Sequence, residues 1–148
     1  MKKIILSITC LAILTACNNG SKLFNSSNSD SVNAVAAAKE NAPAFKFEKE
    51  SYDFGQIMQG EKVSYDFKFK NIGKSPLIIT SATATCGCTV PEYPKEPIQP
   101  GKEGIIHVVF NSATKSGMQN KVVTIKANTV PSETQIHLIG DVKLPKTS

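Results

Sequence analysis

The sequence predicts an all-β fold, a single antiparallel β-sandwich of about seven strands that begins near Phe45. From this residue onward, short segments alternate apolar and polar residues. Because successive side chains of a strand point to opposite faces, this alternation is typical of strands with one buried face. Turn-forming residues separate the segments, and no segment keeps a helical period. Six to eight short strands without intervening helices indicate two sheets that cover each other's apolar faces.

The expected strands follow one another along the chain, each rich in β-branched or aromatic residues. They cover residues 52–57, 63–69, 77–84, 106–110, 122–127 and 136–139. In residues 63–69 the apolar side chains at odd positions are expected to face the core and the polar ones at even positions to face solvent. Turns are expected at residues 71–73, 100–101, 116–117 and 128–132. Gly55 and Gly60 are expected to flank a connection, because glycine adopts backbone angles that other residues resist.

Residues 1–16 have the organisation of a signal peptide. Lys2 and Lys3 precede an uncharged apolar run, and small residues precede Cys17. The run is shorter than the roughly 20 apolar residues that a spanning helix needs. A cysteine directly after the small residues resembles the lipobox of bacterial lipoproteins, and the alternative is an ordinary secretory signal. The resemblance implies cleavage before Cys17, acylation of that cysteine, and a membrane-anchored lipoprotein of the bacterial cell envelope that faces the periplasm.

Residues 17–44 are expected to form the lipidated cysteine and a disordered tether. The segment is rich in serine and asparagine and poor in the large apolar residues that offset ordering entropy. Its alanine-rich part is shorter than the ~12–15 residues that an isolated helix needs in water. As a flexible coil, about 27 residues span roughly 30 Å. The sandwich, residues 45–148, can therefore stand away from the membrane surface.

Charge and motifs argue against several classes of protein. The formal net charge is +5, two units of which belong to Lys2 and Lys3, and no block of five like charges suggests a nucleic-acid tail. The chain has no Gly-x-Ser-x-Gly, His-Glu-x-x-His or phosphate-binding glycine loop. His107 and His137 lie between inward-facing positions and are expected to point to solvent. We therefore expect no catalytic residues, no cofactor and no nucleic-acid partner.

Cys86 and Cys88 are a candidate redox or disulfide pair. They are the cysteines left after Cys10 departs with the signal and Cys17 receives lipid. Alternate residues of an extended strand lie roughly 6.6 Å apart, near the ~6.8 Å upper limit for bridged Cα atoms. Gly87 allows the chain to contract. In the loop-entropy model a three-residue bridge contributes only about 1.6 kcal/mol, so it is a poor staple.

Four roles for this pair remain open. It is a structural pair, a redox-active dithiol, a site for a soft metal such as Cu(I), or the partner of a mixed disulfide with another protein. A zinc site would need four ligands, and only two histidines are available. The proline-rich residues 89–101 that follow are expected to form a stiff loop or sheet edge, with Tyr93 as a candidate contact.

Short motifs follow one another in order through the sandwich region. They are Tyr52-Asp53-Phe54-Gly55-Gln56-Ile57, Gly60-Glu61, Phe67 to Gly73, Pro76-Leu77-Ile78-Ile79, Cys86-Gly87-Cys88-Thr89, Pro100-Gly101 and Leu138-Ile139-Gly140. This series resembles the DUF1573 family, bacterial secreted proteins and lipoproteins of unassigned function. It is similar to the wider immunoglobulin-like group with ASH, hydin and major-sperm-protein-type domains. The resemblance covers about residues 45–143 and implies an immunoglobulin-like sandwich in the cell envelope, without supplying an activity.

The function predicted from the sequence is that of a non-enzymatic module. The membrane is reached through acylated Cys17, and the sandwich is expected to bind a protein or envelope partner at its edges or end loops. The alternative is a thiol redox or copper-handling protein that uses Cys86 and Cys88.

Overall fold

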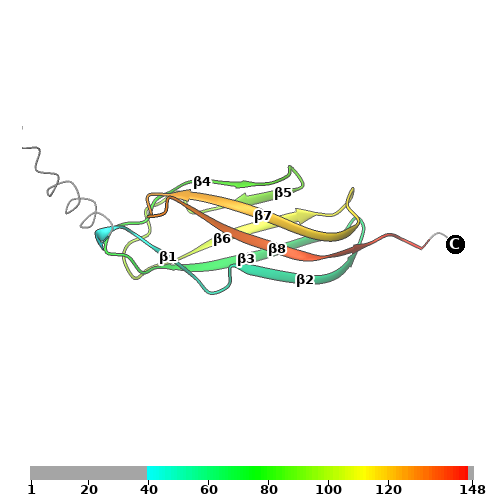
Figure 1. Cartoon of the computed structure of the whole chain (residues 1–148), viewed down its shortest axis with the longest axis horizontal. Helices are drawn as coiled ribbons and strands as arrows, with labels where there is room; N and C mark the ends of the chain where they lie inside the picture. The colour runs from blue at the N-terminus through cyan, green and yellow to red at the C-terminus, as the bar shows by residue number, and fades with distance from the viewer. Residues whose placement is uncertain (1–39, 147–148) are drawn as a thin grey trace, which may run out of the picture.

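The structure, a computed structural model, describes residues 40–146, and the elements of this range are eight β-strands (Figure 1). They are β1 Phe45–Phe47, β2 Ser51–Met58, β3 Lys62–Asn71, β4 Ile79–Ala84, β5 Thr89–Glu92, β6 Glu103–Asn111, β7 Gly117–Ala127 and β8 Glu133–Lys143. The all-β prediction is confirmed, with eight strands where about seven were expected. The predicted signal peptide, Cys17 and most of the predicted tether lie outside the described residues.

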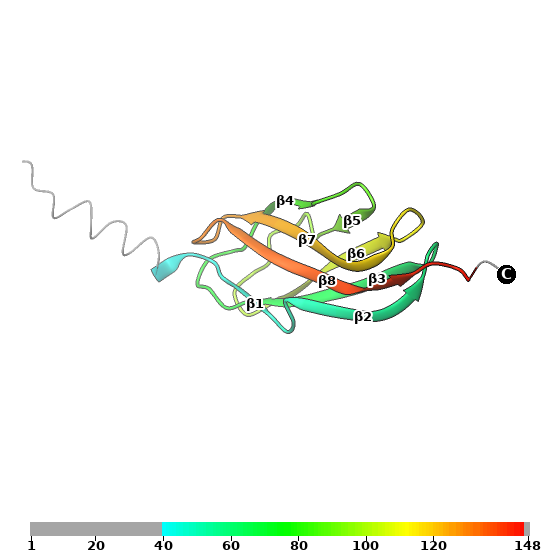
Figure 2. The same cartoon turned by 45° about the vertical axis from the view of Figure 1, so that its right-hand side comes forward.

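Two four-stranded sheets lie face to face (Figure 2). Sheet A has the order β1-β3-β6-β5, and sheet B has the order β2-β8-β7-β4. Neighbours are antiparallel except β2 and β8, which are parallel. The chain therefore changes sheet at every connection except β5–β6 and β7–β8, and two of these crossings are β1–β2 and β4–β5. These two crossings run along opposite edges of the sandwich.

The core lies between the sheets and comes from alternate residues of each strand. In β3, Phe67 and Phe69 are buried while Lys68 and Lys70 are exposed, as the alternation predicted. Burial of such apolar surface is the main favourable term in folding, about 25 cal/mol per Å². The fully buried apolar residues also include Leu77, Ile106, Val108, Phe110, Val123, Ile125, Ile136 and Leu138.

Two local features differ from the sequence prediction, and a third agrees with one of its alternatives. The strand expected at residues 77–84 begins at Ile79, since Leu77 forms only an isolated bridge with Ile98. The proline-rich segment, expected to be a loop or a sheet edge, contains the edge strand β5, which pairs with β6. The expectation that Gly55 flanks a connection is wrong. It lies inside β2 with φ +70°, where the register with β8 shifts, so glycine serves a bulge there.

The chain upstream of β1 contacts the sandwich from Glu40 onward. The Lys74 ammonium lies 2.9 Å from the Glu40 carboxylate, and the Ser75 hydroxyl donates to the Asn41 carbonyl at 2.6 Å. The Ala44 amide donates to the Asn71 side chain at 3.3 Å. These contacts hold the chain entering the sandwich against the β3–β4 connection.

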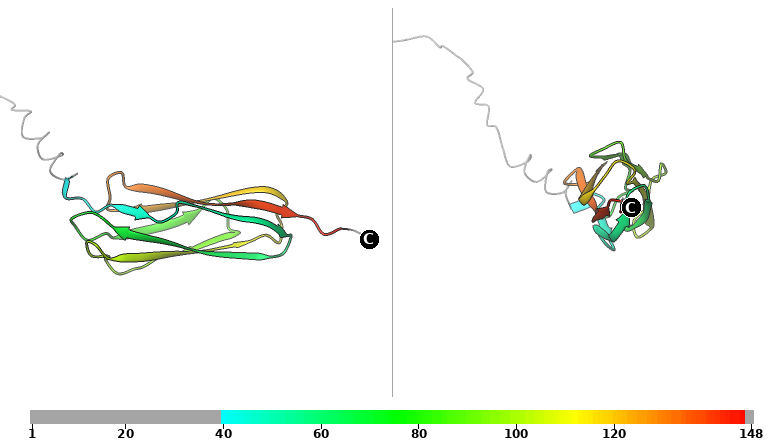
Figure 3. Two further views of the ribbon diagram at one scale, coloured as in Figure 1. Left: turned by 90° about the horizontal axis from the view of Figure 1, so that it is seen from below. Right: turned by 90° about the vertical axis from the view of Figure 1, so that its right-hand side faces the viewer.

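The two ends of the described chain lie at opposite ends of the sandwich (Figures 1 and 3). The end where the chain enters, the N-terminal end, also carries the β3–β4, β5–β6 and β7–β8 connections. The opposite end, the disulfide end, carries the β2–β3, β4–β5 and β6–β7 connections and the segment after β8. Among residues 40–146, no helix has the length and apolar character needed to cross a bilayer.

Candidate functional site

The β4–β5 connection holds Cys86 and Cys88, and their sulfurs form a disulfide across two positions of sequence. The Cα atoms are 5.3 Å apart, closer than the roughly 6.6 Å of an extended strand. The Thr89 amide donates to the Cys86 carbonyl at 3.2 Å, which closes a tight turn around exposed Gly87. The Thr89 hydroxyl lies 3.7 Å from the Cys86 sulfur and 3.9 Å from the Cys88 sulfur.

A groove on the outer face of sheet A begins at this disulfide. Val90 and Val109 lie opposite each other in the β5–β6 register and line it together. Its volume is about 320 Å³. The remaining lining residues are Lys62, Gly87, Cys88, Asn111, Ala113 and Thr114. We call these eight residues the cysteine groove. Cys86 is not among them, so the groove opens onto one sulfur-bearing residue of the pair.

Lysines surround this end of the molecule. Lys62 lines the cysteine groove. Lys121 follows on β7 beside Val122, whose carbonyl accepts from the Thr85 amide at 3.1 Å. Burial, and then the nearby Lys115 ammonium, lower the pKa of Lys121. Positive charge near a cysteine pair favours the thiolate form of a reduced thiol.

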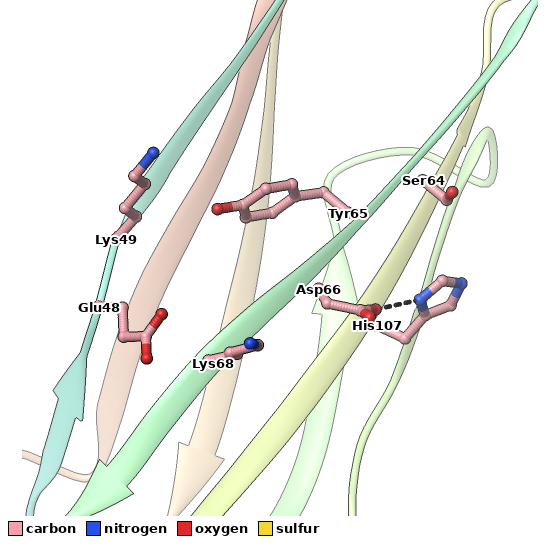
Figure 4. Close-up of a pocket in the computed structure, with 7 residues that line it drawn as sticks. All are labelled: Glu48, Lys49, Ser64, Tyr65, Asp66, Lys68 and His107. Carbon is pink, nitrogen blue, oxygen red and sulfur yellow. Dashed lines mark hydrogen bonds and ion pairs between the residues drawn. The ribbon is translucent and has the colours of Figure 1, made fainter.

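A second and more polar cleft, of about 450 Å³, lies where the β1–β2 connection passes β3 (Figure 4). Asp66 and His107 lie opposite each other on β3 and β6, and their side chains meet at 2.5 Å. Both face outward, which is the orientation expected for His107. Ser64 also lines the cleft, but among residues 40–146 no hydrogen bond joins it to the histidine ring. The cleft therefore lacks the nucleophile–base contact of hydrolytic sites.

The second histidine and the candidate tyrosine are engaged elsewhere. His137 contacts the Asn120 side chain at 3.1 Å. The Tyr93 hydroxyl donates to the Thr80 carbonyl at 3.0 Å, and the Lys95 ammonium lies 3.5 Å from the centre of the Tyr93 ring. Tyr93 thus ties the chain after β5 to β4 across the sandwich edge. In the part of the chain that the structure describes, no three metal-ligating side chains gather.

The β4 edge was not predicted from the sequence. β4 pairs with β7 on one side and is the last strand of sheet B on the other. Because the Thr85 amide bonds to β7, the alternate residues Ala82 and Ala84 direct their backbone groups away from β7. Residues 76–91 carry no charged side chain, although 20% of the chain is charged. Charged side chains and prolines normally keep such edges from pairing with another strand. The uncharged run was therefore the feature of the sequence from which an open edge could have been predicted.

Comparison with known proteins gives a family and a fold. The profile of a family described as "protein of unknown function (DUF1573)" matches residues 45–142. No curated protein matches the sequence.

Among solved structures, a protein of unknown function from Porphyromonas gingivalis W83 superposes with a TM-score of 0.60 at 16% identity. The match covers 70% of this chain and 48% of that one. The ASH/PapD-like domain 7 of human CEP192 superposes with a TM-score of 0.57 at 8% identity. That match covers 95% of this chain and 99% of the CEP192 domain. The secreted serine protease VesC from Vibrio cholerae superposes with a TM-score of 0.52 at 11% identity. That match covers 76% of this chain and 25% of the protease. At these identities the likeness shows an immunoglobulin-like fold. This chain spans about half of the Porphyromonas chain and a quarter of the protease.

Proposed function

This chain belongs to the DUF1573 family, and from that premise we propose that it is a non-enzymatic, lipid-anchored module of the cell envelope. In this proposal its sandwich binds an extended segment of a partner protein along the β4 edge. The segment adds a fifth strand to sheet B, so that main-chain hydrogen bonds supply affinity and side chains supply specificity.

The observation that carries the proposal is the chemistry of the β4 edge. Ala82 and Ala84 direct their backbone donors and acceptors outward, and within residues 40–146 no strand pairs with them there. Their side chains are small and pack inward against the core, so they do not shield these groups. The side chain of Thr83 is exposed on the outer face of sheet B. Between Ala82 and Ala84 an added strand would meet no charged side chain of β4, while at Thr80 the Tyr93 hydroxyl already bonds to the backbone carbonyl.

The position of the ends supports attachment through the N-terminus. The chain enters at the N-terminal end, and β4 runs from that end toward the disulfide end (Figure 1). A lipid on Cys17 would place the N-terminal end nearer the membrane and leave the length of β4 available to a partner. Dual or triple acylation anchors a protein stably, since one chain gives only marginal binding.

The polar cleft of Asp66 and His107 holds a histidine paired with an aspartate but, among residues 40–146, no nucleophile bonded to it. Within the described residues Ser64 makes no bond to the histidine ring. The sequence motifs of hydrolases and phosphate-binding enzymes are likewise missing.

Site-specific photo-crosslinking in intact cells tests the binding edge. A photo-reactive residue at Thr83, on the edge strand, should give one discrete adduct. The matched control is Thr124, which lies opposite Thr83 on the inner strand β7. It should give none.

The variant Ala82→Pro removes an outward amide without touching the β7 ladder, and should abolish the Thr83 adduct. Equal adducts from both positions, or an adduct that survives Ala82→Pro, would count against strand addition.

A further inference from the structure

The geometry points to a second activity, independent of the β4 edge: the Cys86–Cys88 disulfide exchanges with the dithiol of a partner protein. Cys88 is the cysteine that is attacked, and Cys86 leaves as a thiolate. The proposal uses the cysteine groove as the approach path. It concerns a pair of reactive side chains that strand addition leaves unused.

Access to the pair is one-sided. Gly87 and Cys88 line the cysteine groove and Cys86 does not, while Cys88 is half-buried and also packs against the core. Exposed Gly87 has no atom within 4 Å of the position that a Cβ would occupy, so nothing crowds this corner of the turn. A nucleophile that enters along Val90 and Val109 therefore meets Cys88 first.

The surroundings favour both the attacking and the leaving thiolate. Lys62 is one of the lining residues of the groove, and its positive charge attracts an incoming thiolate. The Thr89 hydroxyl, 3.7 Å from the Cys86 sulfur, is placed to donate a hydrogen bond to the thiolate that departs. Rates of exchange rise with the stability of the leaving thiolate and with access to the attacked sulfur.

The disulfide adds little to the fold, because it closes a ring of only three residues. Its two flanking strands are already held independently, β4 by β7 and β5 by β6. Reduction therefore leaves both sheets paired. A pair that can open without unfolding its host is suited to repeated exchange.

The reaction balances in two steps. A thiolate of the partner attacks the Cys88 sulfur, the Cys86–Cys88 bond breaks, and Cys86 leaves with the electron pair and takes up a proton. The second thiolate of the partner then attacks the partner's own sulfur in the mixed disulfide and expels Cys88 as a thiolate. The partner dithiol loses two electrons and becomes a disulfide, and Cys86 and Cys88 become thiols.

The first test is native-state reduction of the full chain by dithiothreitol. Trypsin cuts after Lys74 and Lys95, so a single peptide carries both Cys86 and Cys88 and neither Cys10 nor Cys17. Mass spectrometry of this peptide should show complete, reversible reduction while circular dichroism keeps the β-sheet signal. A pair that is reduced only together with unfolding would overturn the proposal.

The direction of attack is tested with single-cysteine variants and glutathione disulfide. Cys86→Ser leaves Cys88 free, and Cys88→Ser leaves Cys86 free. The free Cys88 should form its mixed disulfide roughly tenfold faster than the free Cys86, as its access to the groove requires. Equal rates, or a faster Cys86, would contradict the assignment of Cys88 as the attacked cysteine.

The role of the groove is tested with a matched pair of lysine variants. Lys62 and Lys70 both point outward from β3, at opposite ends of the strand. Lys62→Gln should slow reduction of the disulfide by glutathione about 2- to 5-fold, the size of an exposed charge effect. Lys70→Gln should leave the rate unchanged. Equal effects of the two variants would show that the groove does not guide the thiolate.

Discussion

At the scale of single residues, Asn71 joins three parts of the N-terminal end. It is fully buried, and its side-chain oxygen accepts from the amides of Ala44 and Gly73, at 3.3 and 3.0 Å. Its side-chain nitrogen donates to the carbonyls of Ser75 and Ile98, at 2.8 and 2.9 Å. The turn predicted at Asn71 accounts for its local bonds to Gly73 and Ser75, but Ala44 and Ile98 come from distant segments that no local pattern reveals.

Asn71→Ala should lower the free energy of unfolding by about 3 kcal/mol, since it leaves several buried polar groups without partners. Urea unfolding followed by circular dichroism measures the change. Asn111→Ala is the control, because Asn111 is exposed and its side chain accepts one bond, from the Ala113 amide. A loss of similar size in both variants would contradict the role given to Asn71.

Gly140 is a second residue whose role follows from packing. A Cβ at this buried position would lie 2.2 Å from the Phe54 ring and 2.7 Å from the Gly55 carbonyl oxygen. Gly140→Ala should therefore destabilise the domain by about 1–3 kcal/mol, the usual cost of overpacking. Gly87→Ala, where the added methyl meets nothing, should change the melting temperature little. Thermal unfolding of the two variants compares them directly.

At the scale of elements, the strands with one buried face were predicted well. Alternation located β3, β6 and β8 because the period of two records which side chains face the core. β5 was not predicted as a strand, because Pro91 interrupts its pattern and its pairing with β6 is a tertiary contact. The order of the strands in each sheet could not be predicted either, because it also depends on tertiary contacts. The position of β4 at a sheet edge follows from that order and was therefore missed.

The candidate site likewise has one part that the sequence predicted and one part that it did not. Spacing and compartment identified Cys86 and Cys88 as a pair. The cysteine groove could not be predicted, because Lys62 and Val109 reach it from different strands, brought together by the register of β3 with β6. The Asp66–His107 contact depends on that register too.

The register of β4 predicts opposite effects of proline at adjacent positions. Thr83→Pro removes an amide that bonds to β7 and should destabilise the domain by about 3 kcal/mol. Ala82→Pro removes an outward amide and should have a much smaller effect. Denaturant unfolding of both variants measures the difference, and similar losses would show that the edge has been assigned to the wrong residues.

At the scale of the whole molecule, attachment at one end and binding along the β4 edge are separable. The fold is shared with proteins whose identity to this chain is 16% or lower, so the fold alone does not select a partner. We propose that the uncharged β4 edge and the cysteine groove are the features that select a partner. The cysteine groove lies at the disulfide end, and the β4 edge runs toward it from the N-terminal end.

Cys17→Ser should move the protein from the membrane fraction to the soluble fraction, because the acyl chains of the proposal are lost. Immunoblotting of fractionated cells measures the distribution, and intact-mass analysis of the unaltered protein should show fatty-acid adducts on Cys17. A Cys17→Ser protein that stays in the membrane fraction would contradict lipid anchoring.

The central claim, that a partner segment pairs with β4, is tested most directly by amide hydrogen exchange of the protein alone and in complex with its crosslinked partner. In the free protein the outward amides of Ala82 and Ala84 should exchange rapidly, while the Thr83 amide is protected by β7. In the complex, exchange of the Ala82 and Ala84 amides should slow by about tenfold or more, with exchange of the Thr83 amide unchanged. Rapid exchange of Ala82 and Ala84 in the complex would contradict the claim.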